Sequence, residues 1–296
     1  MRVFVTGASG FVGSAIVQEL LKAGHEVLGL ARTDSAAASL MKAGAAVHRG
    51  NLEDLESLKA GAAQADAVIH TAFNHDFSKF KANCESDRKV ILALGEALKG
   101  SDRPLVVTSG IGLMNSANRL INENDRPANS EITPRAASEE AALALADEGL
   151  PTYIVRLPPT THGEGDHGFI PMIINMDKEK GESAYIGAGM NRWPAVHRFD
   201  AATLYRLIIE QQPEQRVFHA VAEEGIPFVE IAKAIGTGLQ LPVVSKDHAS
   251  AEAHFGWFTH FASFDCAAAS EQTRRTLSWE PKQIPLLEDL VAGNYF

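Results

Sequence analysis

Short apolar runs alternate with amphipathic stretches along the first half of the chain. Each apolar run has the length of a strand, and apolar residues then recur every three or four positions, as in a helix packed on one face. Strict alternation of strands and helices is typical of a parallel sheet with helices on both faces. The predicted strands are 2–6, 25–31, 45–48, 66–72, 104–109, 151–157 and 216–222, and the predicted helices are 11–23, 35–43, 52–60, 79–98, 135–148 and 201–211.

Glycines spaced three apart follow the first predicted strand and open the first helix. Gly7 can adopt backbone angles that a side chain forbids, Gly10 lets a pyrophosphate approach the main chain, and Gly13 lets the helix lie against its strand. Free N–H groups at the helix start then face the anion. The pattern predicts a dinucleotide site, the alternative being a tight turn without a ligand. The residues expected at the cofactor here are Gly7, Ser9, Gly10, Phe11, Val12 and Gly13.

The end of the second strand indicates which dinucleotide binds. Ala31 and Arg32 stand where an acid would bond a free ribose 2′-hydroxyl, and a guanidinium can fork onto a 2′-phosphate instead. We therefore predict NADP(H) as the cofactor, with Arg32 as a ligand of its phosphate. In the alternative, Arg32 is a solvated loop residue with Asp34 as its surface partner.

The remaining segments contain glycine-rich loops and most of the aromatic residues, including Trp193, Trp257 and Trp279. We expect them to form a substrate lobe over the C-terminal edge of the sheet, where ligands bind in such folds. The predicted fold class is α/β, a doubly wound parallel Rossmann sheet with a smaller C-terminal substrate lobe. The expected dinucleotide-binding domain is 1–159 plus 198–223, and the expected lobe is 160–197 plus 224–296.

Composition excludes several classes of protein. The 296 residues are 45% hydrophobic, which is ordinary for a globular protein with a sizeable core. With 27 Lys plus Arg against 37 Asp plus Glu and no basic cluster, nucleic acid is not an expected partner. No secretory leader or membrane-length apolar run is evident, so we expect a cytoplasmic protein without a membrane partner. Cys84 and Cys266 lack metal-type spacing and predict buried, reduced thiols.

Motifs along nearly the whole chain resemble the extended and atypical branch of the short-chain dehydrogenase/reductase superfamily, often labelled NAD-dependent epimerase/dehydratase. They are similar to that family's TGxxGxxG, GDLxD, HxAA, R-P-x-x-V-Y-G, VHVxD and LGWxP, and lie at 6–13, 50–54, 69–72, 156–163, 192–200 and 277–281. The resemblance implies an oxidoreductase with further cofactor contacts from Asn51, Leu52, Thr71, Ala72, Phe73, Thr108, Arg135, Pro158 and Thr160.

The same resemblance implies a Tyr-x-x-x-Lys pair, which this chain lacks. Counting back from the following strand puts Arg135 in the lysine position and Glu131 in the tyrosine position, whereas a slip of one turn would put Arg135 and Glu139 there. Arg135, permanently protonated, can only bind and polarise, and Glu131 could act as a general acid or base if burial raised its pKa. Alternatively, Glu131 and Arg135 form an i,i+4 surface pair at a helix start.

Two further positions depart from the family pattern. Ser109 lies one residue before Gly110, the position that aligns with the active-site serine. Its hydroxyl could orient a substrate carbonyl, or it could satisfy backbone groups at the strand end. The supporting asparagine of the family is replaced by an acid, which we assign to Asp87, with a solvated helix residue as the alternative.

The loop 162–167 contains two histidines and two acids among glycines. A metal site is not predicted, because metal ligands usually come from rigid elements with a supporting shell. His162 is instead a candidate for proton transfer. We expect His197 to be buried and structural, and Asp200 to cap the helix 201–211.

These residues favour an NADP(H)-dependent oxidoreductase that interconverts a carbonyl and a hydroxyl on a small apolar-to-amphipathic substrate. The proton would come from Glu131, His162 or water, and Ser109 and Arg135 would bind the substrate oxygen. The missing pair leaves a second hypothesis, a protein that senses NADP(H) without turnover. The small-residue face of the helix 136–146 either packs in a homodimer, as the resemblance implies, or on its own domain.

Overall fold

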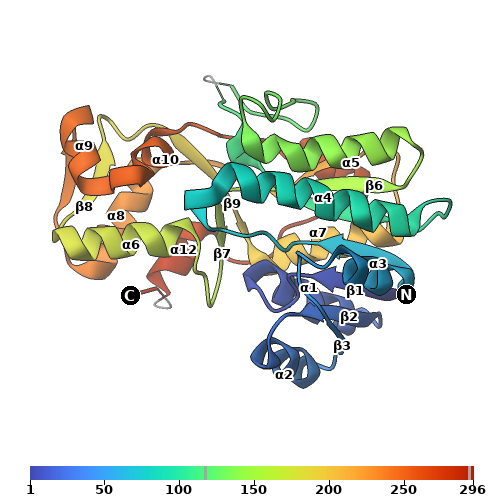
Figure 1. Ribbon diagram of the computed structural model, residues 1–296. Helices are drawn as coiled ribbons and strands as arrows, with labels where there is room; N and C mark the ends of the chain where they lie inside the picture. The colour runs from blue at the N-terminus through green and yellow to red at the C-terminus, as the bar shows by residue number, and fades with distance from the viewer. Residues whose placement is uncertain (117–118, 293–294) are drawn as a thin grey trace.

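The computed structural model describes residues 1–116, 119–292 and 295–296 (Figure 1). Within them, parallel strands form a seven-stranded sheet in the order β10-β6-β5-β4-β1-β2-β3. This order and the flanking helices confirm the predicted doubly wound α/β class. The strands are β1 Arg2–Thr6, β2 Glu26–Ala31, β3 Ala46–Arg49, β4 Ala67–His70, β5 Leu105–Gly110, β6 Thr152–Leu157 and β10 Val217–His219.

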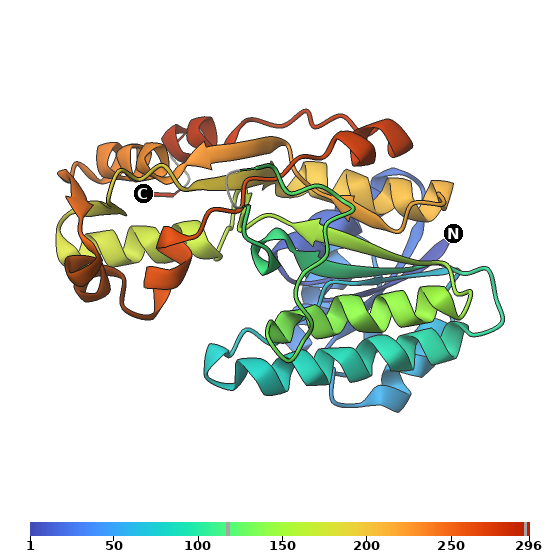
Figure 2. The same ribbon diagram turned by 90° about the horizontal axis from the view of Figure 1, so that it is seen from above.

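Helices cover both faces of this sheet, as Figure 2 shows for α7 on one side and α4 and α5 on the other. Side chains alternate along a strand, so Val3 and Val5 pack in one buried cluster and Phe4 packs in the other. The first cluster includes residues of α1, α2 and α7, and the second includes residues of α3, α4 and α5. The bounds are α1 Phe11–Lys22, α2 Asp34–Ala43, α3 Leu55–Ala63, α4 Phe80–Leu98, α5 Ala137–Asp147 and α7 Arg198–Gln211.

Two helices begin three residues away from their predicted first residue because side chains fix the preceding turn. The carboxamide of Asn51 accepts from the backbone N–H of Glu53 and Asp54, so α3 starts three residues later than predicted. His197 caps α7 through the N–H of Phe199, so this helix starts at Arg198. The prediction of Asp200 as its cap is wrong, because Asp200 lies inside the first turn.

The lobe, at the left of Figure 1, is built around a third buried cluster rich in aromatic side chains. Ile111, Met114 and Ile121 also pack there, whereas Leu277 and Trp279 pack in the first sheet cluster. The exact domain boundaries stay a prediction. The elements are β7 Thr160–His162, β9 Arg192–His197 and β11 Glu223–Pro227 in one sheet, β8 Ser183–Ile186 paired with β12 Val243–Lys246, and α6 Phe169–Lys180, α8 Phe228–Leu239, α9 His248–Phe255, α10 Thr259–Ser263, α11 Glu271–Leu277 and α12 Leu286–Val291.

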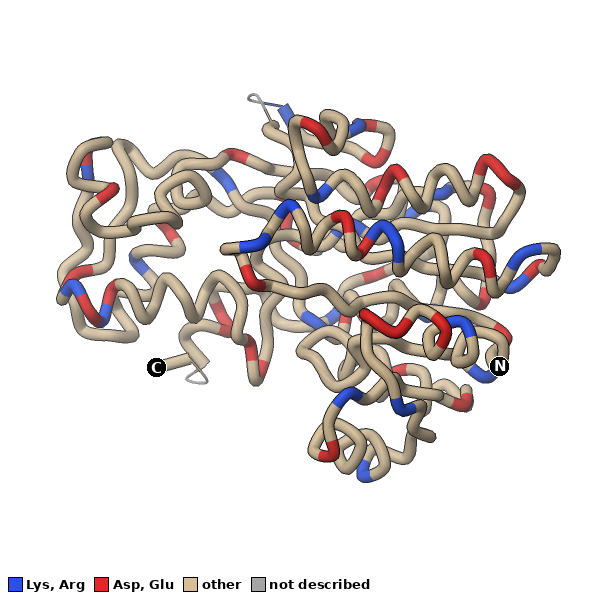
Figure 3. Tube along the Cα trace, in the orientation of Figure 1, with Lys and Arg blue, Asp and Glu red and all other residues tan. Residues whose placement is uncertain are grey.

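The surface and the cysteines bear on other expectations. In Figure 3 basic residues are scattered among acidic ones. Among the described residues, no helix has the length and apolar character needed to cross a membrane.

Cys84 and Cys266 are free and buried, as predicted, and burial raises the pKa of Cys84 to about 11. The small-residue face of α5 packs on its own domain against α4, β5 and β6, and a homodimer stays a prediction.

Candidate functional site

The glycine turn between β1 and α1 has the predicted geometry. Gly7 has a φ of +68°, and a Cβ there would lie 2.6 Å from Thr71 Oγ1. A Cβ on Gly13 would lie 2.0 Å from the carbonyl oxygen of Gly7, so only glycine lets α1 approach its strand so closely. The first turn of α1 has no side-chain cap and no acidic residue. Its free N–H groups therefore suit an anion, and the cradle fits a dinucleotide pyrophosphate.

Two arginines lie near the end of β2, where the adenosine ribose is expected. Arg32 is exposed, and the described residues provide it with no hydrogen bond or ion pair. Asp34 pairs with Arg49 instead, so the alternative in which Asp34 holds Arg32 is wrong. Arg49 is the register partner of Ala31, which places a second guanidinium beside this strand end. Sequence reasoning missed Arg49 because only strand pairing brings it here.

A buried polar chain crosses the carboxyl end of the sheet from Thr6 to Arg135. Thr6 Oγ1 lies 2.7 Å from His70 Nδ1, and His70 Nε2 lies 2.9 Å from an oxygen of Asp87. The other Asp87 oxygen accepts from Arg135 at 3.0 Å and from Ser138. Burial alone would raise the pKa of Asp87, but His70, Arg135 and Ser138 together lower it. Asp87 is only 4% exposed, so the solvated alternative is wrong.

Arg135 is held at the ends of β4 and β5. Its Nη2 donates to the carbonyl oxygen of Thr108 at 3.0 Å, and its guanidinium carbon lies 4.3 Å from the ring centre of Phe73. The short helix η3, Pro134–Ala136, carries it. Glu131 lies in the exposed turn before η3, and no hydrogen bond or ion pair joins it to another described residue. The predicted surface pair of Glu131 and Arg135 is therefore wrong, because Arg135 pairs with Asp87.

Ser109 belongs to a second buried network. Its hydroxyl donates to Glu139 at 2.7 Å, and Glu139 receives two further bonds from Arg156 at 2.8 and 2.7 Å. The Ser109 hydroxyl therefore does not serve backbone groups at the strand end. The side chain of Arg156 is fully buried and that of Glu139 is 2% exposed. Ser109 is thus fixed by an ion pair that sequence spacing did not reveal.

His162 lies in β7, away from Arg135. It is 1% exposed, and its Nδ1 is 2.8 Å from a carboxylate oxygen of Asp289 in α12. Its ring meets that of His197 edge-on at 5.3 Å. His197 is buried as predicted, and burial, then His162, lowers its pKa. Asp200, mispredicted as a cap, accepts from the N–H groups of Lys282 and Gln283 and so ties α7 to the C-terminal segment.

The aromatic residues His75 and Phe77, which lie close to the predicted cofactor residue Phe73, were missed by the sequence analysis. The ring of His75 meets Phe73 edge-on at 5.2 Å, and Phe77 lies 5.3 Å from Trp257 in the lobe. Phe73 thus contacts both His75 and Arg135. His75 is exposed, and partial removal from water, then the positive charges of Arg135 and His167, lower its pKa. No motif marks His75, because its position matters only once the loop is folded.

The remaining predicted cofactor residues lie at or beside the carboxyl edge of the large sheet. Thr71 Oγ1 donates to the Thr6 carbonyl at 2.8 Å, and Thr108 Oγ1 donates to that of His70 at 2.8 Å. Thr160 Oγ1 donates to the Pro194 carbonyl oxygen. These contacts fix the strand ends, and the cofactor contacts themselves stay predictions.

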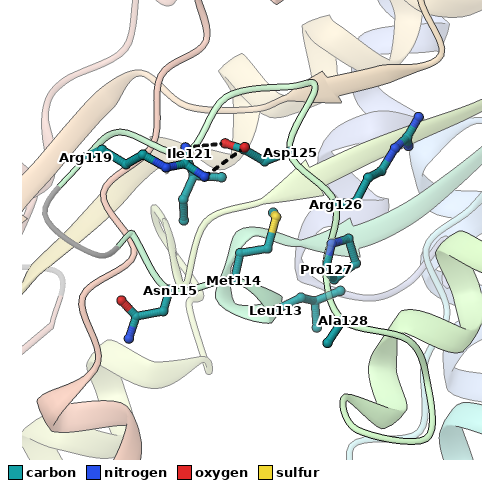
Figure 4. A pocket seen from close by; sticks show the side chains of 9 residues that line it. All are labelled: Leu113, Met114, Asn115, Arg119, Ile121, Asp125, Arg126, Pro127 and Ala128. Carbon is teal, nitrogen blue, oxygen red and sulfur yellow. Dashed lines mark hydrogen bonds and ion pairs between the residues drawn. The ribbon is translucent and has the colours of Figure 1, made fainter.

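A pocket of about 270 Å³ follows β5. Figure 4 shows Arg119 joined to Asp125 by an ion pair above Met114. The two Arg119 nitrogens donate to the two Asp125 oxygens at 2.6 and 2.8 Å. The lining is mixed apolar and polar, and consists of Leu113, Met114, Asn115, Arg119, Ile121, Asp125, Arg126, Pro127 and Ala128.

Comparison with known proteins defines the class. Residues 3–220 match the sequence profile of the NAD dependent epimerase/dehydratase family. The chain therefore belongs to this family, which depends on a nicotinamide cofactor, and relatives named as dehydrogenases and reductases support an oxidoreductase. Among described residues, no group of histidine, cysteine and acidic side chains could hold a metal ion.

Individual relatives cover most or all of the chain. The uncharacterized protein C2A9.02 of Schizosaccharomyces pombe is 50% identical over 296 residues, 100% of both chains. A sterol-4-alpha-carboxylate 3-dehydrogenase of Dictyostelium discoideum is 25% identical, over 77% of this chain and 73% of that protein. The dTDP-glucose 4,6-dehydratase DesIV of Streptomyces venezuelae shares the fold, with a TM-score of 0.79 at 19% identity over 99% of this chain and 96% of that one.

Proposed function

We propose that this protein is an NADP(H)-dependent oxidoreductase that interconverts a carbonyl and a hydroxyl on a small apolar-to-amphipathic substrate. The observation that carries the proposal is Arg135, a cation anchored by Asp87 and Thr108 at the strand ends where the cofactor ribose and the substrate oxygen would meet. When bound, the nicotinamide supplies or accepts the hydride. Arg135 binds the substrate oxygen and stabilises the negative charge that develops on it.

The choice of NADP(H) rests on Arg32 and Arg49. Arg32 has no ion-pair partner among the described residues. Within them, Arg49 forms an ion pair only with Asp34, whose side chain is highly exposed. A 2′-phosphate near the end of β2 would meet two guanidinium groups there. No carboxylate needed for a free 2′-hydroxyl follows Ala31 directly.

Proton transfer needs a group that can release its proton, which Arg135 cannot do. Glu131 and His162 were predicted for this role, but within the described residues no hydrogen bond, ion pair or ring contact links Glu131 to Arg135 or Phe73, and His162 is buried beside Asp289. His75 fits the role better because it shares the Phe73 ring with Arg135. In the reduction, the substrate carbon gains the hydride and the oxygen gains the proton from the His75 imidazolium. In the oxidation, neutral His75 takes that proton back.

The aromatic side chains after β4 and in the lobe favour an apolar substrate. Trp257 is 55% exposed and contacts Phe77, so an apolar surface is available where the lobe meets the segment after β4. One relative is named a sterol-4-alpha-carboxylate 3-dehydrogenase, and a sterol carboxylate is amphipathic, which supports the amphipathic end of the proposed range. We propose apolar ketones, aldehydes and their alcohols as the substrates to test.

The test is oxidation of NADPH, followed by absorbance, against a panel of apolar and polar aldehydes, ketones and enones. We expect turnover with apolar carbonyl compounds. Arg135→Met should lower kcat at least about 100-fold, whereas Arg275→Met should leave kcat unchanged. Arg275 is the matched control because its side chain is 72% exposed on α11. Absence of turnover in a protein that binds NADPH would refute the enzyme and support the sensor hypothesis.

A further inference from the structure

Arg198, the first residue of α7, contacts Phe11, the residue that follows the glycine turn. Its guanidinium carbon lies 5.1 Å from the ring centre of Phe11 and 4.9 Å from that of Phe199. Phe11 is the first residue of α1, immediately after the turn. A Cβ on Gly163 would lie 3.3 Å from Arg198 Cγ, so the 163–168 loop crosses the arginine stem closely.

This arginine lies over two aromatic rings, but among the described residues it lacks the carboxylate that normally pairs with a half-buried guanidinium. Its Nε is buried without a hydrogen bond, and no carboxylate within the described ranges forms an ion pair with it. Burial lowers the pKa of Arg198, and the exposed Glu164 opposes this only through its charge at a distance. An unpaired, partly desolvated charge destabilises the protein. The position of Arg198 therefore suits the binding of an anion by its guanidinium.

The surroundings indicate where that anion lies. The ring of His167 meets Phe11 edge-on at 5.8 Å, so Arg198 and His167 both approach the same side chain at the mouth of the turn. The loop that carries His167 is held by Tyr295, whose hydroxyl accepts from the N–H of Gly163 at 3.0 Å and donates to Asp166 at 3.1 Å. The Arg198 charge therefore lies beside Phe11, the residue that opens α1 and its free N–H groups.

We infer that Arg198 binds the pyrophosphate of the dinucleotide, together with the N-terminus of α1. This inference rests on the proposed cofactor. The helix end supplies about half a positive charge, whereas the pyrophosphate carries two negative charges, so a full guanidinium charge adds most of the missing compensation. Arg198 opens α7, which directly follows strand β9 of the lobe. A cofactor bound by Arg198 and α1 would therefore connect the large sheet to the lobe.

The test measures NADP⁺ binding calorimetrically for the parent, Arg198→Met, Arg198→Lys and Arg206→Met. Arg206 is a matched control on the same helix, because it is paired with Glu19 at 2.8 Å and with Glu210 at 2.6 Å. We expect Arg198→Met to weaken NADP⁺ binding about 10- to 100-fold, Arg198→Lys to recover part of this, and Arg206→Met to change nothing. Adenosine 2′-monophosphate, which has no pyrophosphate, should bind parent and Arg198→Met equally by ligand-detected NMR.

Thermal unfolding of the free protein provides a second readout. Removing an unpaired, partly buried charge should leave the Tm of Arg198→Met unchanged or raised, whereas Arg206→Met should lower it. Unchanged NADP⁺ affinity in Arg198→Met would overturn the inference while leaving the proposed cofactor intact. Failure of the parent to bind NADP⁺ or NAD⁺ would overturn both.

Discussion

Replacing Glu139 with alanine would leave the Arg156 charge without its partner in the interior. The side chains of Arg156 and Glu139 are 0% and 2% exposed, and two hydrogen bonds join them. The guanidinium has no contact with bulk solvent in the fold. Among the remaining contacts of Arg156, His219 Nε2 lies 3.3 Å away, and burial lowers the pKa of this histidine to about 3, so it stays neutral and offers a hydrogen-bond acceptor but no negative charge.

The magnitude follows from the desolvated charge. Breaking a buried ion pair costs about 3–5 kcal/mol, and loss of the Ser109 bond adds about 1 kcal/mol. With an unfolding entropy of about 2.1 cal/mol/K per residue, the 296-residue chain has about 0.6 kcal/mol/K in total, so the expected fall in Tm is about 6–10 °C.

A double variant separates the charge effect from the lost packing. Glu139→Met combined with Arg156→Met removes both charges but keeps most of the volume, and should recover most of the stability lost in Glu139→Ala. Ser109 loses its acceptor in both proteins, so this contribution cancels. The assay is thermal unfolding followed by circular dichroism at one pH and one protein concentration. A Tm within about 1 °C of the parent for Glu139→Ala, or a double variant less stable than the single one, would refute the reasoning.

Further predictions concern pH and cofactor choice. The pKa of Asp87 is lowered in the fold, so its contribution to stability is present above the unfolded value of about 3.9 and is lost as the pH falls through the lower folded value. Asp87→Ala should therefore lower the free energy of unfolding by about 3–5 kcal/mol at neutral pH, and this free energy should depend less on pH below about 4 than in the parent, as measured by urea unfolding. The same pH dependence below about 4 in both proteins would contradict this. Arg32→Ser should weaken NADPH binding at least about 10-fold and leave NADH binding unchanged, and an equal loss for both cofactors would exclude Arg32 from the 2′-phosphate site. Because the pKa of His75 is lowered, kcat/KM for reduction should rise as the pH falls below about 6.5, and His75→Asn should lose this rise; a pH profile shared with the parent would exclude His75.

The fold and the glycine turn could be predicted because their signals are local. Strand periodicity and the Gly7, Gly10, Gly13 spacing depend on neighbouring residues, and the structure follows them within a few positions. The start of α7 was mispredicted because two residues competed as caps, and His197 has that role rather than Asp200.

The polar networks could not be read from the chain in the same way. Asp87 contacts residues 17 positions before and 48 positions after it, and only the assembled sheet brings them together. Glu131 and Arg135 have the spacing of a helical pair, yet Asp87 offers Arg135 a buried partner, which outweighs a solvated one. His75 and Arg198 were missed for the same reason: His75 has no sequence motif, and the VHVxD-like stretch that contains Arg198 does not indicate its contact with Phe11.

The contact between Trp257 and Phe77 gives this protein an intrinsic optical reporter. Trp193 and Trp279 are each 1% exposed, whereas Trp257 is 55% exposed at the contact between the lobe and the segment after β4. A water-soluble collisional quencher therefore acts chiefly on one of the three indoles. The fraction of tryptophan fluorescence that is quenched therefore reports whether the lobe and the segment after β4 stay in contact. Opening and closing can thus be followed in solution without any attached label.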